Sequence, residues 1–173
     1  MRRNKKIIVI SIILLIIGAI LLNSNYMIGL NESFIERDAR DSQKINNDWL
    51  NVKETNNRMS ALLFYDEAIK KHTFSIYVNN PGFSYGYTFK HGGSSSTIDS
   101  GIKGYSYGAY GMVIMSMNTK RVSQIKLENK ESLEIVRLDP VKPFVLLVPE
   151  TVEKVSLFDT EGNAVPIDNI EVY

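Results

Sequence analysis

The residues best suited to contact a ligand lie between Gly82 and Gly111, in a segment rich in both glycine and tyrosine. Planar aromatic side chains can stack on sugar rings or hold an extended peptide, and phenolic hydroxyls can add hydrogen bonds. The candidate ligand-binding residues are Tyr85, Tyr87, Phe89, Tyr105, Tyr107 and Tyr110. The first three alternate along one predicted strand and so share one of its faces. The alternative is a ladder of aromatic rings that fills the core of a sheet.

A second candidate for chemistry is the pair of histidines, His72 and His91, which a predicted hairpin brings to the same open end. A metal site there would need a carboxylate, for which Asp66 or Glu67 could serve. Histidines beside a strand and before a pair of glycines are far more often plain loop residues. We therefore predict no metal site and no cofactor.

The segment that begins at His91 contains Gly92, Gly93 and three serines. Backbone amides of such a loop can cradle an anion, but a phosphate loop also needs a following helix and a Lys-Ser or Lys-Thr pair, which this segment lacks. Ser94, His91 and Asp99 contain the residue types of a catalytic triad, yet each must orient the next, and local spacing gives no such geometry. A flexible loop is the favoured interpretation, so no catalytic residue is predicted.

Composition narrows the function classes. The chain has no cysteine, which excludes disulfides, cysteine-ligated zinc and thiol nucleophiles. Four of its cations precede the first apolar run, and the remaining 16 basic and 19 acidic residues give a net charge near −3. A slightly acidic body lacks the clustered lysine and arginine that neutralise phosphates, so nucleic acid is not an expected partner.

The N-terminus predicts a membrane anchor. Residues 1–6 form a basic cytoplasmic tail, and residues 7–30 contain the apolar run Ile7–Leu22 followed by an interfacial stretch. As a helix, the run spans about 24 Å, slightly less than the roughly 30 Å of a bilayer core. A cleaved signal peptide is the alternative, but the expected small residues are missing at a suitable site. Flanking cations stay in the cytoplasm, which predicts a single-pass protein of the cell membrane with an extracytoplasmic C-terminal body.

Residues 31–58 are polar and contain neither glycine nor proline. Ile45, Trp49 and Val52 fall at the spacing of one helical face. Ser33 with Glu36 matches a helix-capping box. These patterns predict a helical stalk between the anchor and the folded body.

Residues 59–173 are predicted to form the extracytoplasmic β-rich domain. Strands are expected at 60–65, 73–78, 83–89, 110–117, 121–127, 132–138, 144–148, 154–158 and 164–167. Asn79–Gly82 has the composition of a type II turn, and Gly162 suits a hairpin that needs positive φ. Short strands at regular spacing predict a mainly β fold, an antiparallel β-sandwich or barrel-like domain preceded by a transmembrane helix and a helical stalk.

The stretch LLFYDEAIKKHTFSIYVNNPGFSYGYTFKHGG, with the later PFVLLVP and VSLFDTEGNAVPI, resembles uncharacterised small membrane-anchored extracytoplasmic proteins of Bacillus-type Gram-positive bacteria. The resemblance covers most of the predicted exported part, although an arginine expected near Lys90 is absent. It implies the same topology and a β-rich exported body. It carries no known activity, cofactor or site residues.

These features predict a non-enzymatic, membrane-tethered interaction or accessory domain. Its partners would be membrane lipid, through the N-terminal helix, and either another envelope protein or a cell-wall polymer. Two alternatives stay open. One is a cell-envelope hydrolase or metal-dependent enzyme that uses His72, His91 and nearby carboxylates. The other is a structural subunit of a membrane complex that pairs through its anchor or stalk.

Overall fold

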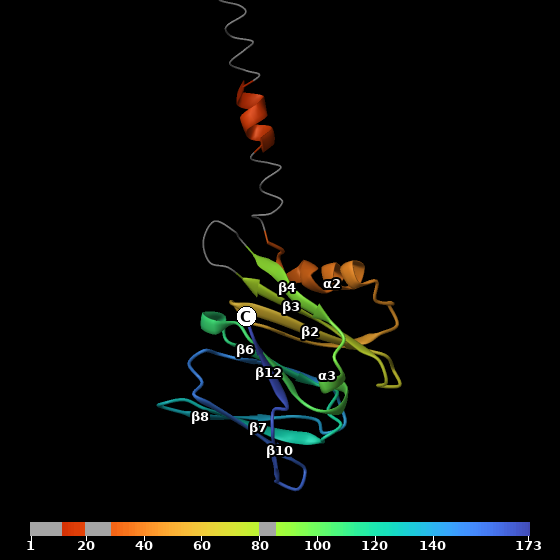
Figure 1. The fold of residues 1–173 in the computed structure, drawn as a ribbon, viewed down its shortest axis with the longest axis vertical. Coiled ribbons are helices and arrows are strands. Elements are labelled where there is room, and N and C mark those ends of the chain that lie inside the picture. Colours follow the sequence, from red (N-terminus) through yellow and green to blue (C-terminus); the bar gives the residue numbers. More distant parts are fainter. Residues whose placement is uncertain (1–11, 20–28, 80–85) are drawn as a thin grey trace, which may run out of the picture.

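The computed structural model describes residues 12–19, 29–79 and 86–173 (Figure 1). The predicted basic tail, most of the predicted anchor, the turn at Asn80–Gly82 and Tyr85 therefore lie outside the described residues. Residues 12–19 are helical. Within the three described ranges, no helix combines the length and the apolar character needed to cross a bilayer.

The fold is mainly β, as the sequence predicts, and its described strands form three four-stranded sheets. Pairing is antiparallel except between β12 and β5, which are parallel. Sheet A has the order β1 (Leu50–Thr55), β2 (Met59–Tyr65), β3 (His72–Asn79) and β4 (Tyr87–Gly93). Sheet B has the order β12 (Asn169–Val172), β5 (Lys103–Ser106), β6 (Met112–Ser116) and β9 (Phe144–Val148). Sheet C has the order β11 (Ala164–Val165), β10 (Lys154–Asp159), β7 (Val122–Glu128) and β8 (Leu133–Arg137).

The sheets stack as layers beneath a helix, in the order α2 (Ile35–Gln43), sheet A, sheet B and sheet C (Figure 1). The side chains of β2 alternate between the two faces of sheet A, and both faces are covered, so β2 is buried along its whole length. Leu62 and Phe64 pack beneath α2, whereas Ala61 and Leu63 face sheet B. Sheet B is also covered on both faces, which confirms the prediction of a doubly buried strand at 144–148.

Short helices complete the description: η1 (Glu32–Phe34) precedes α2, α3 (Ser96–Ser100) follows β4, and η2 (Gly108–Tyr110) links β5 to β6. The predicted hairpins β7–β8 and β10–β11 are confirmed, and Gly162 between the latter has φ +85°. The predicted antiparallel pairing of β3 with β4 is confirmed as well.

The predicted helical stalk over residues 31–58, irregular around 46–47 and 56–57, is wrong beyond its first part, because helix α2 ends at Gln43 and residues 50–55 form β1. Lys44 adopts a left-handed conformation that stops the helix. The Arg40 guanidinium then donates to the carbonyls of Asn46 and Trp49, at 3.0 and 3.1 Å, and holds the returning chain. Trp49 packs in the layer beneath α2, whereas Val52 faces the layer between sheets A and B.

The prediction of a flexible loop over residues 91–96 with no helix after it is also wrong, because β4 extends to Gly93 and helix α3 begins at Ser96. His91, Gly92 and Gly93 belong to β4, where they pair with Ile76, Ser75 and Phe74. A register shift between Ile76 and Tyr77 keeps the strand paired beyond Phe89. Gly92 is required there, because a Cβ at this position would lie 2.7 Å from the carbonyl oxygen of Phe74.

Candidate functional site

The carboxylate of Asp168, the residue before strand β12, holds the start of this strand in place. Asp168 accepts a hydrogen bond from the backbone N–H of Ile102 at 2.7 Å, and its own N–H donates to the Ile102 carbonyl at 2.9 Å. The Lys120 ammonium reaches both oxygens of Asp168, at 2.7 and 2.9 Å. The Lys120 hydrogen bond, followed by the one from Ile102, lowers the pKa of Asp168. The carboxylate thus fastens the start of β12 beside β5.

The other end of β12 is held by an ion pair and an aromatic stack. Glu171 pairs with the Lys103 ammonium at 2.7 Å and accepts a hydrogen bond from the Tyr173 hydroxyl at 2.6 Å. Hydrogen bonding to Lys103 lowers the pKa of Glu171, and desolvation raises the pKa of Tyr173 to about 12. The Tyr173 ring lies nearly parallel to that of Tyr107, with centroids 5.2 Å apart. Both ends of this short strand are therefore tied down by specific side chains.

The outer edge of β12 is open. β12 is an end strand of sheet B, and no other described strand pairs with its outer edge. Ile170 and Val172 are 50% and 77% exposed, and Tyr173 is 55% exposed. An edge strand with exposed apolar side chains offers both backbone hydrogen-bonding groups and apolar contact area to another chain. We call Asn169–Tyr173 and this free side the β12 edge.

A groove of about 370 Å³ runs beside the β12 edge. Its lining includes the apolar side chains of Met112, Val148, Val152, Val155, Ile167 and Ile170. Glu150 and Glu153 lie on the same lining. Glu150 is paired with Arg58 at 2.5 Å, and Glu153 with Lys130 at 3.8 Å. The groove thus presents an apolar lining together with ion-paired carboxylates, directly next to a free strand edge.

Tyr85 lies outside the described residues, and the other five aromatic residues selected from the sequence do not share one surface. Tyr87 is buried beneath α2, and its hydroxyl donates to the carbonyl of Asn56 at 2.6 Å. Phe89 is 46% exposed and meets the ring of Tyr77 edge-on at 5.6 Å.

Tyr105, Tyr107 and Tyr110 belong to the layer between sheets A and B, on the opposite side of sheet A from Tyr87. Tyr105 and Tyr107 are buried, and Tyr110 is partly buried against them. Among the described residues, the hydroxyls of Tyr105 and Tyr107 have no hydrogen-bond partner. Desolvation raises the pKa of both phenols, so they are neutral side chains of the core. For these two residues the structure has the packed arrangement that the sequence analysis offered as the alternative.

His91 lies in the same aromatic layer as Tyr105. Its ring is 5.5 Å from that of Phe74 and 5.4 Å from that of Tyr105, measured between centroids. The Tyr173 hydroxyl lies 3.4 Å from both ring nitrogens. His91 therefore joins β4 to the end of β12.

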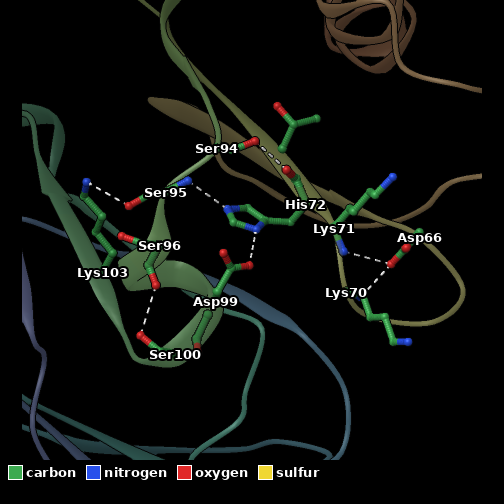
Figure 2. A network of polar contacts seen from close by, with 12 residues as sticks. Asp66, Lys70, Lys71, His72, Ser94, Ser95, Ser96, Asp99, Ser100 and Lys103 are labelled. Atoms are coloured by element: carbon green, nitrogen blue, oxygen red, sulfur yellow. Dashed lines mark hydrogen bonds and ion pairs between the residues drawn. The ribbon is translucent and has the colours of Figure 1, made fainter.

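The other histidine, His72, connects β3 to α3 and to the segment after β4 (Figure 2). Its Nδ1 lies 2.6 Å from a carboxylate oxygen of Asp99, and the backbone N–H of Ser95 donates to its Nε2 at 3.0 Å. Since Nε2 accepts a hydrogen bond, the proton of the neutral ring resides on Nδ1, which donates to Asp99. The Ser94 hydroxyl donates to the His72 carbonyl at 2.6 Å.

This geometry assigns His72 a structural role. A catalytic histidine of the serine-hydrolase type directs Nε2 at the nucleophile while a carboxylate holds Nδ1. Here the carboxylate is present, but a backbone amide occupies Nε2 and the Ser94 hydroxyl points to a carbonyl. Ser95 instead accepts a hydrogen bond from Lys103 at 3.2 Å, which links the network to the ion pair on β12.

No arrangement of three or more histidine, aspartate or glutamate side chains suited to a metal ion occurs within residues 12–19, 29–79 and 86–173. Asp66, a candidate ligand in the sequence analysis, instead accepts hydrogen bonds from the N–H groups of Lys70 and Lys71. These bonds lower its pKa and fix the turn between β2 and β3.

The sequence analysis missed the residues that build the β12 edge: Lys103, Lys120, Asp168, Glu171 and Tyr173. A local signal was present, because Ile170, Val172 and Tyr173 are residue types that strands favour, and Asn169 and Glu171 alternate with Ile170 and Val172. The parallel pairing with β5 gave no such signal, since it joins segments far apart in the chain.

Comparison of the chain with protein-family models, curated proteins and solved structures finds no match in any of the three.

Proposed function

We propose that this chain is a membrane-tethered extracytoplasmic interaction domain that binds an extended segment of a partner protein along the β12 edge. The observation that carries the proposal is the free edge of β12, with Ile170 and Val172 exposed beside an apolar groove. A partner in extended conformation satisfies such an edge with its own backbone and places alternate side chains on the two faces of the sheet.

The two faces of β12 favour a partner with alternating character. Ile170 lines the groove, so every second side chain of an added strand would lie next to apolar surface. Glu171 and Tyr173 contact Lys103, Tyr107 and His91, so the intervening side chains would lie next to polar and aromatic groups. This division supports a polypeptide partner over a wall polymer, because a polysaccharide has no backbone that continues a β-ladder.

The tether is the predicted N-terminal anchor. The apolar run Ile7–Leu22 follows Arg2, Arg3, Lys5 and Lys6, a pattern typical of an uncleaved anchor whose N-terminus stays in the cytoplasm. An anchor in lipid would confine the sandwich-like body to the outer membrane surface. Confinement raises its effective concentration toward other membrane proteins, so that a short strand can bind usefully without a large interface.

Site-specific cross-linking in intact cells tests the proposal. p-Benzoylphenylalanine at position 170, in the full-length chain, should form a protein adduct on illumination. Val172→Lys should abolish the adduct, because an edge lysine blocks strand addition. The matched control is Val141→Lys, since Val141 is similarly exposed at 64% but lies away from β12. An adduct that survives Val172→Lys, a dimer of this chain, or an adduct with glycan would each overturn the proposal.

A further inference from the structure

His72 is buried at a junction where a change in its protonation must change the local hydrogen bonding. Both ring nitrogens are committed, Nδ1 to Asp99 and Nε2 to the N–H of Ser95 (Figure 2). The side chain is only 2% exposed. A proton added to the ring goes to Nε2, since Nδ1 already carries one, and it turns Nε2 from an acceptor into a donor. The Ser95 N–H would then face another N–H and lose its hydrogen bond.

We propose that His72 is a pH-sensitive latch that releases the β12 edge when it is protonated. Ser95 is the connecting residue, because its hydroxyl accepts a hydrogen bond from Lys103 and its amide binds His72. Lys103 in turn pairs with Glu171 of β12. The Lys103 ammonium also lies 5.1 Å from the centroid of the Tyr105 ring. Displacement of Ser95 removes one of the contacts that hold this ammonium, and the Glu171 end of β12 loosens. The consequence for partner binding rests on the proposed function, but the latch itself does not.

Charged groups of α3, β5, β12 and the turn before β3 surround His72. Asp99 on α3 stays paired with Nδ1 in both states and favours the imidazolium, with its own side chain half exposed. The positive charge of Lys103 on β5 opposes a positive charge on His72, but Lys103 is itself paired with Glu171 on β12. The turn before β3 contributes two further cations, Lys70 and Lys71. It also contributes one carboxylate, Asp66, which accepts hydrogen bonds from the backbone N–H groups of both lysines. Histidine is in general the side chain whose charge changes between about pH 8 and about pH 5, so this is the range in which the latch is tested.

Hydrogen exchange of the full chain in lipid nanodiscs tests the latch without any partner. On going from about pH 7.5 to about pH 5.5, the amides of Ser95 and of 169–173 should lose protection at least about fivefold after correction for intrinsic exchange, as expected for one lost hydrogen bond. Amides of β7, a strand of sheet C that contains none of the residues of this network, should keep theirs. Unchanged protection at Ser95 and β12 would overturn the proposal.

Two matched variants assign the response. His72→Gln keeps an acceptor for the Ser95 N–H at every pH and should remove the response. His91→Gln changes the other of the two histidines. Because His91 contacts Tyr173, this variant should alter the protection of residue 173 at every pH, but it should leave the pH response of Ser95 intact. If His72→Gln does not fold, Asp99→Asn replaces it: without the carboxylate the imidazolium is less favoured, so the transition should move to lower pH. A response that follows His91, or that ignores Asp99, would contradict the latch. Failure of cross-linking at position 170 with an intact latch would contradict only the proposed function.

Discussion

The two edges of sheet B differ in how their backbone groups are satisfied. At β9, the carboxylate of Glu54 on β1 accepts a hydrogen bond from the backbone N–H of Leu147 at 2.8 Å. At β12, the apolar side chains of Ile170 and Val172 lie exposed beside a groove, and no other described strand pairs with the outer edge. Proteins usually block sheet edges against chance pairing. One edge of this sheet is closed by an inward-pointing charge, and the other is left open.

The carboxylate that satisfies the β9 edge is partly buried, and burial of its charge costs free energy. Burial is the main cause that raises the pKa of Glu54, and only the Leu147 hydrogen bond acts in the opposite direction. An ionised carboxylate is a costly way to satisfy one N–H, so its placement at β9 is consistent with edge blocking. The contrast teaches that, within sheet B, the exposed apolar edge is the one at β12, where it lies beside a groove, and this is the basis of the proposed function.

The largest effect is expected from opening the closed edge. Glu54→Ala leaves the Leu147 N–H without its acceptor and should destabilise the domain by about 2 kcal/mol. Urea unfolding of the full chain, followed by the fluorescence of Trp49, measures the change. A loss below about 0.5 kcal/mol, the range of an ordinary surface substitution, would mean that Glu54 does not protect this edge.

A somewhat smaller effect is expected at the open edge. Asp168→Ala removes the acceptor of the Ile102 N–H and the partner of Lys120, and should cost about 1–2 kcal/mol because the Lys120 pair is partly screened by solvent. Exchange of the β12 amides should accelerate more than exchange of the β9 amides. Equal acceleration of both strands would show that Asp168 stabilises the whole sheet and not β12 in particular.

Removal of the hydroxyl group from two fully buried tyrosines should change the stability of the domain in different directions. The Tyr77 hydroxyl donates to Asp38 at 2.7 Å, whereas the Tyr105 hydroxyl has no partner among the described residues. Tyr77→Phe should destabilise the domain by about 1.5 kcal/mol, and Tyr105→Phe should be neutral or stabilising by up to about 1 kcal/mol. Thermal unfolding of both variants under one condition gives the signs. A destabilised Tyr105→Phe variant would reveal a hydrogen bond at the β5 side of β12.

The smallest effect concerns the charge of Glu54. Its folded pKa lies above its ordinary value of 4.5, so the folded state holds its proton more tightly than the unfolded state. Stability therefore falls as pH rises from 4.5 through the folded pKa. Glu54→Gln keeps an acceptor for Leu147 without the charge and should be more stable than the parent at neutral pH, by less than about 1 kcal/mol. This advantage should disappear as pH falls to 4.5; an advantage that persists in acid would exclude desolvation as its cause.

The sequence predicted those parts of the fold that depend on neighbouring residues. Alternation between Thr73 and Val78 indicated β3, and the turn around Gly162 indicated the β10–β11 hairpin. The same reasoning failed where a distant contact decides the outcome. Ile45, Trp49 and Val52 have helical spacing, but Ile45 and Trp49 lie in the connection after α2, and pairing of residues 50–55 with β2 places Val52 in β1.

The candidate site was harder to predict, because its contacts join distant residues. Lys120 meets Asp168 across 48 positions, and Glu54 meets Leu147 across 93. The tyrosines that looked suited to ligand contact are apolar enough to be drawn into the core between two sheets, as Tyr105 was. The Tyr173 ring is exposed because it follows the last residue of an edge strand, and only the assembled sheet shows that β12 is at an edge.

Amide protection in the presence of the captured partner tests strand addition most directly. The segment cross-linked at position 170, supplied as a synthetic peptide to the full chain in nanodiscs, should protect the amides of 169–173 and leave those of 144–148 unchanged. The peptide should also protect the amides of 169–173 in the Val141→Lys variant, but it should not protect them in the Val172→Lys variant. Protection at 144–148, or none at 169–173, would contradict the assignment of β12 as the binding edge.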